Sequence, residues 1–260
     1  MSDLLPVALR AARAGASVLR ETGLPRPGGA AELKGRGDYV TAADRHSEAA
    51  IVEVLAREAP GVAVLAEEAG GVRASTMWAV DPLDGTTNFT RGLPVVAVSV
   101  ALLDGGKPAV GVVIAPFLDL ELTAVAGGGA NMNGERLQRD RDVEPASAIV
   151  ATGFPFRNKA LLGRYLPVMS GALGRFEDLR RAGAAALDLA WTASSSFDGF
   201  FELGLNTWDV AAGALLVLEA GGKVTDWSGG DTWLETGDIL AGAPAVHEAL
   251  LELAAQPPHG

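Results

Sequence analysis

In the stretch Asp81-Pro82-Leu83-Asp84-Gly85-Thr86-Thr87-Asn88-Phe89, two carboxylates, a tight turn and hydroxyl side chains fall within nine residues. Residues 76–80, directly before it, are short, mostly apolar and followed by turn residues, which predicts a buried strand. A strand that ends in this way delivers two acid side chains to the carboxyl edge of its sheet. Ligands bind at that edge in open α/β sheets.

The residues between the two carboxylates restrict where those carboxylates can lie. Pro82 fixes its own φ and biases Asp81 toward an extended conformation. Gly85 allows a sharp bend, after which the N–H groups of Gly85, Thr86 and Thr87 can open a short helix toward an anion. Paired hard oxygen ligands beside such a helix start favour Mg²⁺ and phosphate. A solvated Asp-Gly turn is the alternative for either carboxylate alone, and the complete string argues against it.

This string resembles the signature of the inositol monophosphatase superfamily, and other parts of that family's pattern follow in order. They are Lys34 with Asp38-Tyr39-Val40-Thr41 and Asp44, then Glu67-Glu68, then Trp208-Asp209-Val210-Ala211-Ala212-Gly213 with Glu219-Ala220-Gly221-Gly222. The resemblance spans about residues 4 to 255. It implies an alternating, layered α-β-α-β-α sandwich of the inositol monophosphatase and fructose-1,6-bisphosphatase type. It also implies a single catalytic unit, residues 1–260, of two intimately packed α/β halves at roughly 1–145 and 146–255.

The resemblance implies roles for individual residues. The ligands of two or three Mg²⁺ ions, which Mn²⁺ could replace, would be the side chains of Glu67, Asp81, Asp84 and Asp209 and the carbonyl oxygen of Leu83. The group that orients and deprotonates the attacking water would be Thr86, with Asp44 behind it and Glu67 nearby. The substrate would contact Leu83, Asp84, Gly85, Thr86, Gly183, Ala184, Ala185, Glu202 and Asp209. Lys34 would lie near the metal-bound water, and a surface salt bridge is the alternative for it.

The second signature also has a physical interpretation of its own. Thr207 can cap a helix whose first turn contains Asp209, which places that carboxylate at the positive end of the helix dipole. Residues 210–218 are almost all apolar, which predicts a buried helix. Asp209 could serve only as a capping partner, but Asp84 and Glu67 are expected at the same sheet edge and favour a shared metal cluster. Glu202, at the end of a predicted strand, is a candidate acceptor for a sugar or polyol hydroxyl.

Three positions depart from the family's usual pattern. Ala184 stands where Ser or Thr is usual, Ser195-Ser196 replaces a glycine-arginine pair, and Ala66 replaces a glycine. None of the three removes an expected metal ligand. The first two leave the identity of the substrate open.

The remaining elements follow from apolar periodicity and turn residues. Helices are expected at 4–20, from the capping residue Thr41 to about 58, and at 158–173, 184–193, 208–220 and 244–254, with a loop at 24–36. Strands are expected at 95–103, 108–116, 120–126, 148–152, 176–180, 199–203 and 238–241, the first three joined as antiparallel hairpins.

Composition limits the class of protein. The chain has 260 residues, which can bury a sizeable core, and no cysteine, which excludes disulfides, thiolate metal sites and cysteine nucleophiles. A formal net charge of −11 argues against a general nucleic-acid binder. His46, His247 and His259 lack the spacing of a zinc site. No leader or membrane-spanning run is visible, so we expect a cytoplasmic protein without membrane or direct nucleic-acid contacts. The resemblance implies a homodimer.

The sequence therefore predicts Mg²⁺-dependent hydrolysis of a small phosphomonoester, with inositol 1-phosphate as first choice and lithium sensitivity implied by the resemblance. Alternatives in the superfamily are fructose-1,6-bisphosphatase, histidinol-phosphate phosphatase and 3′-phosphoadenosine 5′-phosphate phosphatase. Glu202 favours a polyol over a nucleotide, since a carboxylate would repel a second phosphate. A different class remains open, because some bacterial relatives act as binding partners of the transcription machinery. An inactive scaffold would be expected to have lost ligands, and none is lost.

Overall fold

The computed structural model describes residues 2–26, 32–35, 38–138 and 143–256, omitting the side chains of residues 2, 32–35 and 38–40. Its α-helices are α1 (Leu5–Thr22), α2 (Ala42–Glu58), α3 (Thr86–Thr90), α4 (Leu162–Arg175), α5 (Ala185–Ala193), α6 (Thr207–Glu219), α7 (Trp233–Thr236) and α8 (Pro244–Ala254), and its 3₁₀ turns are η1 (Ser2–Leu4), η2 (Pro145–Ser147) and η3 (Lys159–Leu161). Its strands are β1 (Glu32–Gly35), β2 (Asp38–Val40), β3 (Ala63–Ala66), β4 (Gly70–Gly71), β5 (Met77–Asp84), β6 (Ala97–Asp104), β7 (Lys107–Ala115), β8 (Leu120–Val125), β9 (Gly129–Met132), β10 (Glu135–Arg136), β11 (Ile149–Thr152), β12 (Asp178–Arg180), β13 (Gly199–Glu202), β14 (Lys223–Thr225) and β15 (Ile239–Gly242).

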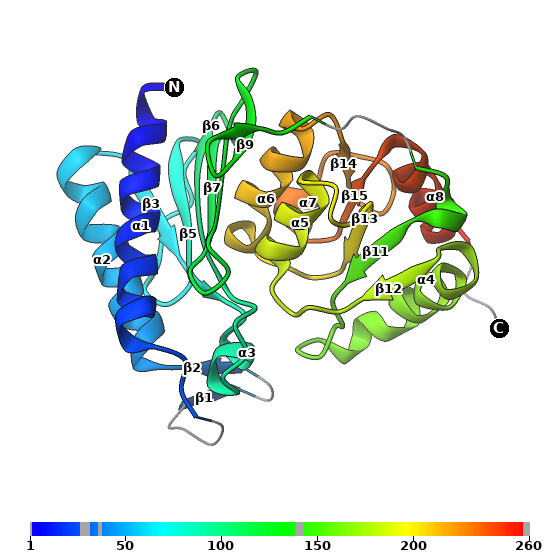
Figure 1. Cartoon of the computed structure of the whole chain (residues 1–260), viewed down its shortest axis with the longest axis horizontal. Helices are drawn as coiled ribbons and strands as arrows, with labels where there is room; N and C mark the ends of the chain where they lie inside the picture. The colour runs from blue at the N-terminus through cyan, green and yellow to red at the C-terminus, as the bar shows by residue number, and fades with distance from the viewer. Residues whose placement is uncertain (1, 27–31, 36–37, 139–142, 257–260) are drawn as a thin grey trace.

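Helices and sheets alternate in layers across the molecule (Figure 1). Helices α1 and α2 pack on one face of a sheet centred on β5, β6 and β7, and α5 and α6 pack on its other face. The same α5 and α6 contact the strands of a second sheet, whose far side is covered by α4 and α8. The predicted α-β-α-β-α sandwich is confirmed. The division into two halves that act as one catalytic unit stays a prediction.

Strand direction decides which chain segments meet at the edges of the two large sheets. The described strands form an eight-stranded sheet in the order β10-β9-β8-β7-β6-β5-β3-β4, a five-stranded sheet in the order β12-β11-β13-β15-β14, and the small pair β1-β2. Strands β3 and β5 are parallel neighbours, as are β12 and β11 and, on the other side of β11, β13. The segments that follow β3 and β5 therefore lie together, as do those that follow β12, β11 and β13.

Covering both faces of the first sheet explains why its central strands are apolar on both sides. Val100 and Val112 pack in the core that contains α1 and α2, and Ala101 and Val113 pack in the core that contains α5 and α6, as expected for strands that lie between two helical layers. Helix α6 approaches β7 closely, because a Cβ on Gly111 would lie 3.0 Å from the carbonyl oxygen of Ala212. Small residues at this contact let the middle helical layer sit directly on the sheet.

Most predicted elements are present, with corrections at their ends. The predicted strand at 76–80 continues to Asp84, because β6 pairs with both Asp81 and Asp84 across an irregular register. The loop predicted at 24–36 contains β1, and the strand predicted from Phe176 begins at Asp178. Helix α6 is capped by Asn206 rather than by Thr207. Strand β14 and helix α7 were not predicted, since elements this short show no periodicity.

Within the described ranges, no helix combines the length and the apolar character that crossing a bilayer would require.

Candidate active site

A cavity of about 540 Å³ opens where the carboxyl ends of parallel strands from both large sheets meet. Among the described residues that line it are five carboxylates, three cations and the predicted substrate segment. They are Glu67, Asp81, Asp84, Glu202 and Asp209; Arg157, Lys159 and Arg181; and Leu83 to Thr87 with Gly183 to Ala185. The cavity therefore brings together residues from both signatures that are more than a hundred positions apart.

The end of β5 presents two carboxylates to the cavity because the strand is irregular there. A regular strand would point Asp81 and Asp84 to opposite faces. The register with β6 shifts between these two residues, and the N–H of Leu83 donates to Asp81 Oδ1 at 3.0 Å. Ser47 of α2 donates its hydroxyl to the carbonyl oxygen of Pro82 at 2.8 Å, which holds the irregular segment in place.

Asp84 also caps a helix that belongs to the middle layer. Its Oδ2 accepts the N–H of Ala186 at 2.6 Å, at the N-terminus of α5. The residue at the N-cap position of α5 is Ala184, which has no side-chain oxygen to offer. The carboxylate of Asp84 supplies that missing acceptor, and the helix dipole favours a negative charge at this position. Asp84 thus fixes the Gly183–Ala185 segment against the end of β5.

Thr86, at the start of α3, lies between two acceptors. Its Oγ1 is 3.1 Å from Asp44 Oδ1 and 3.1 Å from the carbonyl oxygen of Leu83, and its single hydroxyl proton can serve one of them at a time. Asp44 is fully buried at the start of α2, where it forms a capping box with Thr41. Asp44 Oδ2 accepts the Thr41 N–H at 2.8 Å and the Thr41 hydroxyl at 2.5 Å. This pairing leaves Asp44 Oδ1 directed at Thr86.

Glu67 follows β3, and the two residues after it are held by a side chain that was not predicted from the sequence. The Glu67 N–H donates to the carbonyl oxygen of Val80, which continues the parallel pairing of β3 with β5. Glu48, one helical turn after Asp44, accepts the N–H groups of Glu68 and Ala69 at 2.8 Å each. Glu48 is buried on the face of α2 that carries Asp44, and that shared helical face was the available sequence signal.

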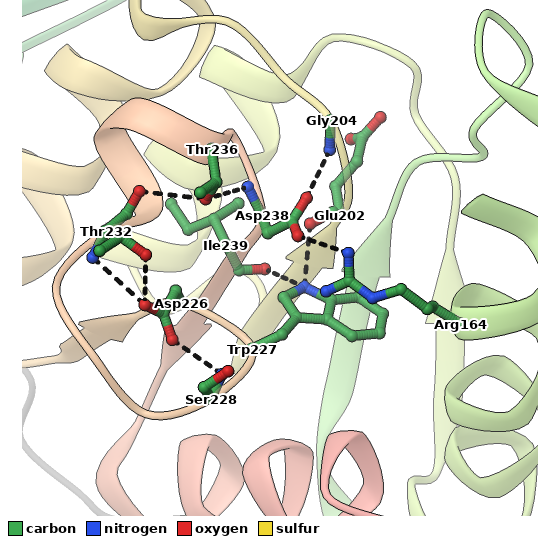
Figure 2. A network of polar contacts seen from close by, with 10 residues as sticks. All are labelled: Arg164, Glu202, Gly204, Asp226, Trp227, Ser228, Thr232, Thr236, Asp238 and Ile239. Carbon is green, nitrogen blue, oxygen red and sulfur yellow. Dashed lines mark hydrogen bonds and ion pairs between the residues drawn. The ribbon is translucent and has the colours of Figure 1, made fainter. Parts of the chain in front are cut away.

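Glu202 and Asp209 lie at the two ends of the short connection between β13 and α6. Figure 2 shows the contacts that hold the Glu202 end of this connection. The indole N–H of Trp227 lies 3.0 Å from the Glu202 carbonyl oxygen and 3.2 Å from that of Ile239. Asp238 Oδ1 accepts the N–H of Gly204 at 3.0 Å, and Asp238 Oδ2 pairs with Arg164 of α4 at 2.8 Å.

The other end of this connection is fixed by a local cap. The N–H of Asn206 donates to Asp209 Oδ2 at 2.6 Å, within the capping box that begins α6. The Glu202 side chain lies against Gly153, where a Cβ would come within 2.0 Å of the Glu202 carboxyl carbon and of its Oε1. The Glu202 carboxyl group can take this position because residue 153 has no side chain.

Burial and mutual repulsion raise the pKa values of the cavity carboxylates. Burial raises the pKa of Asp84 to about 7, with the charge of Asp209 adding to the effect. Burial, with the charges of Glu67, Asp84 and Asp209, holds the pKa of Asp81 well above its usual range. Burial and the charge of Asp209 raise the pKa of Glu202 to about 8, against the opposing charge of Arg181. Carboxylates that repel one another in this way favour a shared cation.

The donor set suits a hard divalent cation, because every candidate ligand in the cavity is an oxygen. The charges of Glu67, Asp84 and Asp209 all raise the pKa of Asp81, so the four predicted metal ligands lie close together. In the described part of the chain, however, no three His, Cys, Asp or Glu side chains already surround one metal position. The residues present fit Mg²⁺ by their chemistry and proximity, and side-chain adjustment would complete the coordination.

Several cavity residues were not found from the sequence. Arg157 and Lys159 follow β11 and Arg181 follows β12, so the carboxyl ends of parallel strands were the usable signal. Asp188 of α5 was also missed. It is almost fully buried, its pKa is raised well above the usual range by burial, and its Oδ1 has no hydrogen-bond partner among the described residues. Lys34 was predicted to lie near the metal-bound water, and its side chain falls outside the part of the chain that the structure describes.

Comparison with known proteins agrees with the fold and with the family resemblance. The family model described as "Inositol monophosphatase family" matches residues 1–258. The chain is 41% identical over 254 residues to "Nus factor SuhB" of Escherichia coli K12, covering 96% of this chain and 95% of that protein. It is 41% identical over 260 residues to "Inositol-1-monophosphatase" of Mesorhizobium japonicum, covering 98% and 97%.

Two solved structures give the same result. The extragenic suppressor protein suhB of Bartonella henselae superimposes with a TM-score of 0.89 at 38% identity, over 98% of this chain and 99% of that one. The inositol monophosphatase of Anabaena superimposes with a TM-score of 0.85 at 36% identity, over 99% and 97%. The chain therefore belongs to the inositol monophosphatase family.

Proposed function

We propose that this protein is a Mg²⁺-dependent phosphomonoesterase, with inositol 1-phosphate or a similar polyol phosphate as its first-choice substrate. One observation carries the proposal. Glu67, Asp81, Asp84 and Asp209 line one cavity and raise the pKa values of their neighbours, as an unneutralised set of metal ligands would. Membership of the inositol monophosphatase family supports the same activity.

Different residues of the cavity would have different roles in the reaction. The four carboxylates and the carbonyl oxygen of Leu83 would hold the metal ions. Bound there, magnesium supplies positive charge for the phosphoryl oxygens and makes a bound water more acidic. The Thr86 hydroxyl donates to Asp44 Oδ1, so a lone pair of Thr86 Oγ1 can accept a hydrogen bond from the attacking water. As Thr86 Oγ1 takes the proton of that water, its own proton would pass to Asp44. Glu202 would accept hydrogen bonds from hydroxyls of the leaving alcohol, and the Gly183–Ala185 segment would lie along its ring.

The decisive experiment measures phosphate release from inositol 1-phosphate with Mg²⁺ and with excess EDTA. Asp84→Asn and Asp209→Asn should each reduce turnover by at least about a hundredfold, because each removes a charge from the metal cluster. Asp231→Asn is the control, since Asp231 is exposed and lies outside the cavity wall. A full rate in EDTA would refute the proposal.

The alternatives within the superfamily are separated by a panel of substrates. Fructose 1,6-bisphosphate, histidinol phosphate and 3′-phosphoadenosine 5′-phosphate should be compared with inositol 1-phosphate at one Mg²⁺ concentration. The cavity presents Glu202, which is suited to hydroxyls, and we expect the polyol phosphate to be hydrolysed with a higher kcat/KM than the nucleotide.

A binding role in transcription is the second candidate function, and the names of the relatives favour it. Several proteins that are 40% or 41% identical to this chain over nearly their whole length are named "Nus factor SuhB". The test is whether a catalytically dead Asp84→Asn variant still binds transcription elongation complexes from the same cell. Binding by that variant would show a role that is independent of hydrolysis. If the wild-type protein did not bind these complexes, this candidate function would be ruled out.

We further propose a homodimer. Leu166 and Leu173 on the outer face of α4 are 55% and 65% exposed, which suits a contact between copies. Light scattering coupled to size exclusion should give twice the mass of the chain, and a monomer mass would contradict this.

A further inference from the structure

Two buried hydroxyl groups lie within hydrogen-bonding distance of each other behind the Glu202 side of the cavity wall. The Oγ1 atom of Thr152 is 2.8 Å from the hydroxyl oxygen of Tyr165, and both residues are almost fully buried. Thr152 is the last residue of β11, and Tyr165 belongs to α4. Neither residue lines the cavity, so an effect of either on the substrate has to pass through a residue that does.

The direction of these hydrogen bonds follows from the number of protons available. The hydroxyl oxygen of Thr152 lies 2.7 Å from the carbonyl oxygen of Phe201 and 3.2 Å from that of Gly153, and its single proton serves the nearer one. Thr152 Oγ1 can then only accept from Tyr165, so the Tyr165 hydroxyl donates to it. Met169 Sδ, 3.7 Å from the Tyr165 hydroxyl, is a weaker acceptor. A chain of two hydrogen bonds therefore runs from Tyr165 through Thr152 to the Phe201 carbonyl group.

This chain ends at the residue directly before Glu202. Thr152 and Phe201 are the last paired residues of the parallel strands β11 and β13. The next residues are Gly153 and Glu202, and a Cβ on Gly153 would lie 2.0 Å from the Glu202 carboxyl carbon. The Thr152 hydroxyl thus joins the two strands immediately before the point where Glu202 enters the cavity wall.

The donor of this chain is itself fixed in place. The ring of Tyr165 stacks on that of Phe201, with centroids 5.8 Å apart, and meets the ring of Phe154 edge-on, with centroids 6.0 Å apart. Burial raises the pKa of Tyr165 to about 12, with the charge of Glu202 adding to the effect, so Tyr165 keeps its proton at neutral pH. Tyr165 is therefore a permanent donor with a set orientation.

The main chain of Glu202 is held on both sides of its Cα. The Thr152 hydroxyl bonds the carbonyl group of Phe201, and the Trp227 indole N–H lies 3.0 Å from the carbonyl oxygen of Glu202 itself (Figure 2). Each carbonyl group belongs to a planar peptide unit, so fixing both fixes the two planes that meet at the Glu202 Cα. The direction of the Glu202 side chain is then fixed as well.

We propose that Thr152, oriented by Tyr165, is a positioning residue that directs the Glu202 carboxylate toward the hydroxyls of the leaving alcohol. This inference rests on the proposed function and adds to it a residue that sets the preference for a polyol phosphate. Without the Thr152 hydroxyl, the peptide plane before Glu202 loses this restraint and can rotate. Glu202 would then meet the alcohol less often in the productive geometry, while the metal ligands on other segments would keep their places.

Thr152→Val tests the proposal, since valine keeps the branched shape and removes the hydroxyl. The ratio of kcat/KM for inositol 1-phosphate to that for p-nitrophenyl phosphate should fall about tenfold, an effect typical of a buried acceptor left without its donor. Tyr165→Phe should lower this ratio about threefold, because Thr152 keeps its bond to Phe201 and loses only the group that orients it. Thr152→Ser restores the hydroxyl and should bring the ratio back to within about threefold of the wild-type value.

Thr192→Val is the matched control. Thr192 is fully buried, its hydroxyl donates to the carbonyl oxygen of Asp188 at 2.8 Å, and it does not line the cavity. This variant should lose stability to chemical denaturation much as Thr152→Val does, and it should leave the substrate ratio unchanged. If both variants lowered the ratio equally, the effect would come from a general loss of stability and the positioning role would be wrong.

A double variant asks whether Thr152 acts through Glu202. In Glu202→Gln the contact with the alcohol is already weakened, so adding Thr152→Val should change the substrate ratio by less than about twofold. A further fall as large as that in Thr152→Val alone would show that Thr152 acts elsewhere and would overturn the proposal. An unchanged ratio in the single variant Thr152→Val would overturn it too, and would leave the proposed phosphatase activity standing.

Binding measurements keep this inference separable from the proposed function. If the wild-type protein released phosphate from neither substrate, the proposed function would fail. Calorimetry of the Mg²⁺-loaded protein with inositol 1-phosphate and with inorganic phosphate would then decide the positioning role. Thr152→Val should weaken the binding of inositol 1-phosphate about tenfold and leave that of inorganic phosphate unchanged. Unchanged binding of inositol 1-phosphate, or none in the wild type, would overturn the positioning role as well.

Discussion

The indole N–H of Trp227 donates to the main-chain carbonyl oxygen of Glu202, 3.0 Å away, and so connects the loop after β14 to a cavity residue (Figure 2). Trp227→Phe keeps the buried ring and removes the donor. We expect unfolding free energy to fall by about 1 kcal/mol, the net worth of one hydrogen bond. We also expect kcat/KM for inositol 1-phosphate to fall more than that for p-nitrophenyl phosphate, since only the former uses Glu202.

Trp233→Phe is the control for this change, because Trp233 is equally buried and does not line the cavity. If Trp227→Phe lowered kcat/KM equally for both substrates, the indole would support only the fold and not the position of Glu202.

Glu202→Gln tests the contact with the alcohol directly. Glutamine keeps the size of the side chain and removes the charge that accepts from ring hydroxyls. The ratio of kcat/KM between inositol 1-phosphate and p-nitrophenyl phosphate should fall roughly ten- to a hundredfold, because a buried polar partner left unsatisfied costs about 1–3 kcal/mol. Steady-state kinetics on both substrates measure it. No change in the ratio would remove the reason for preferring a polyol phosphate.

Thr86→Ala should separate catalysis from metal binding. The hydroxyl touches Asp44 and the Leu83 carbonyl oxygen, and we assign it to the attacking water. Turnover should fall by about a hundredfold or more, a typical contribution of a group that handles the proton, while Mg²⁺ affinity measured by calorimetry stays within about threefold. Thr90→Ala, in the same helix but outside the cavity wall, should change neither. Loss of Mg²⁺ binding in Thr86→Ala would show that its hydroxyl serves the metal site instead.

The raised carboxylate pKa values predict how pH acts on the metal-free protein. The pKa of Asp84 rises from an ordinary 3.8 to about 7 through burial, so the folded state binds more protons than the unfolded state between these values. Its contribution to stability is therefore present at low pH and is lost as pH rises toward about 7. Mg²⁺ must displace those protons, so its apparent affinity should increase with pH up to about 7 and then level off. Thermal melts with EDTA or with Mg²⁺ at several pH values test both trends, and an Mg²⁺ affinity independent of pH would contradict them.

Asp188→Asn should stabilise the protein at neutral pH. Burial holds the pKa of Asp188 well above its usual range, and Oδ1 lacks a partner among the described residues. An amide of the same shape can still accept from the Gly183 N–H and avoids burying a charge. We expect a gain of about 1 kcal/mol in unfolding free energy at neutral pH, shrinking toward acidic pH where the carboxyl is protonated in both states. A destabilised variant at neutral pH would show instead that Arg181 stabilises the charged form; Asp231→Asn controls for surface charge.

The features predicted well from the sequence are those that depend on residues close together in the chain. The capping box of Thr41 and Asp44 needs only residues three apart, and it is present. The sharp turn at Gly85 needs a positive φ, and Gly85 has a φ of 91°. The start of α6 was misplaced by one residue, because Asn206 and Thr207 are both good caps. The N–H of Asn206 reaches Asp209, three residues on, and this spacing decides between them.

The features that were missed depend on contacts across the fold. Nothing near Trp227 in the sequence indicates that its indole will meet Glu202, which lies in another strand. Likewise, Arg157, Lys159 and Arg181 reach one cavity because β12, β11 and β13 run parallel, and only the folded sheet shows that order. The four metal-ligand candidates were found because their motifs are long, whereas Glu48 and Asp188 each stand alone in otherwise ordinary helices.

The close approach of Gly153 to the Glu202 carboxyl group imposes an order on the mutations that this site can accept. Any side chain at position 153 would displace the Glu202 carboxyl group from its place in the cavity wall, so a lineage that keeps the carboxyl group there keeps the glycine. A shorter residue 202 would remove this constraint. If position 153 then gained a side chain, a glutamate restored at position 202 could not regain the original place, and a change of substrate through residue 202 would be hard to reverse.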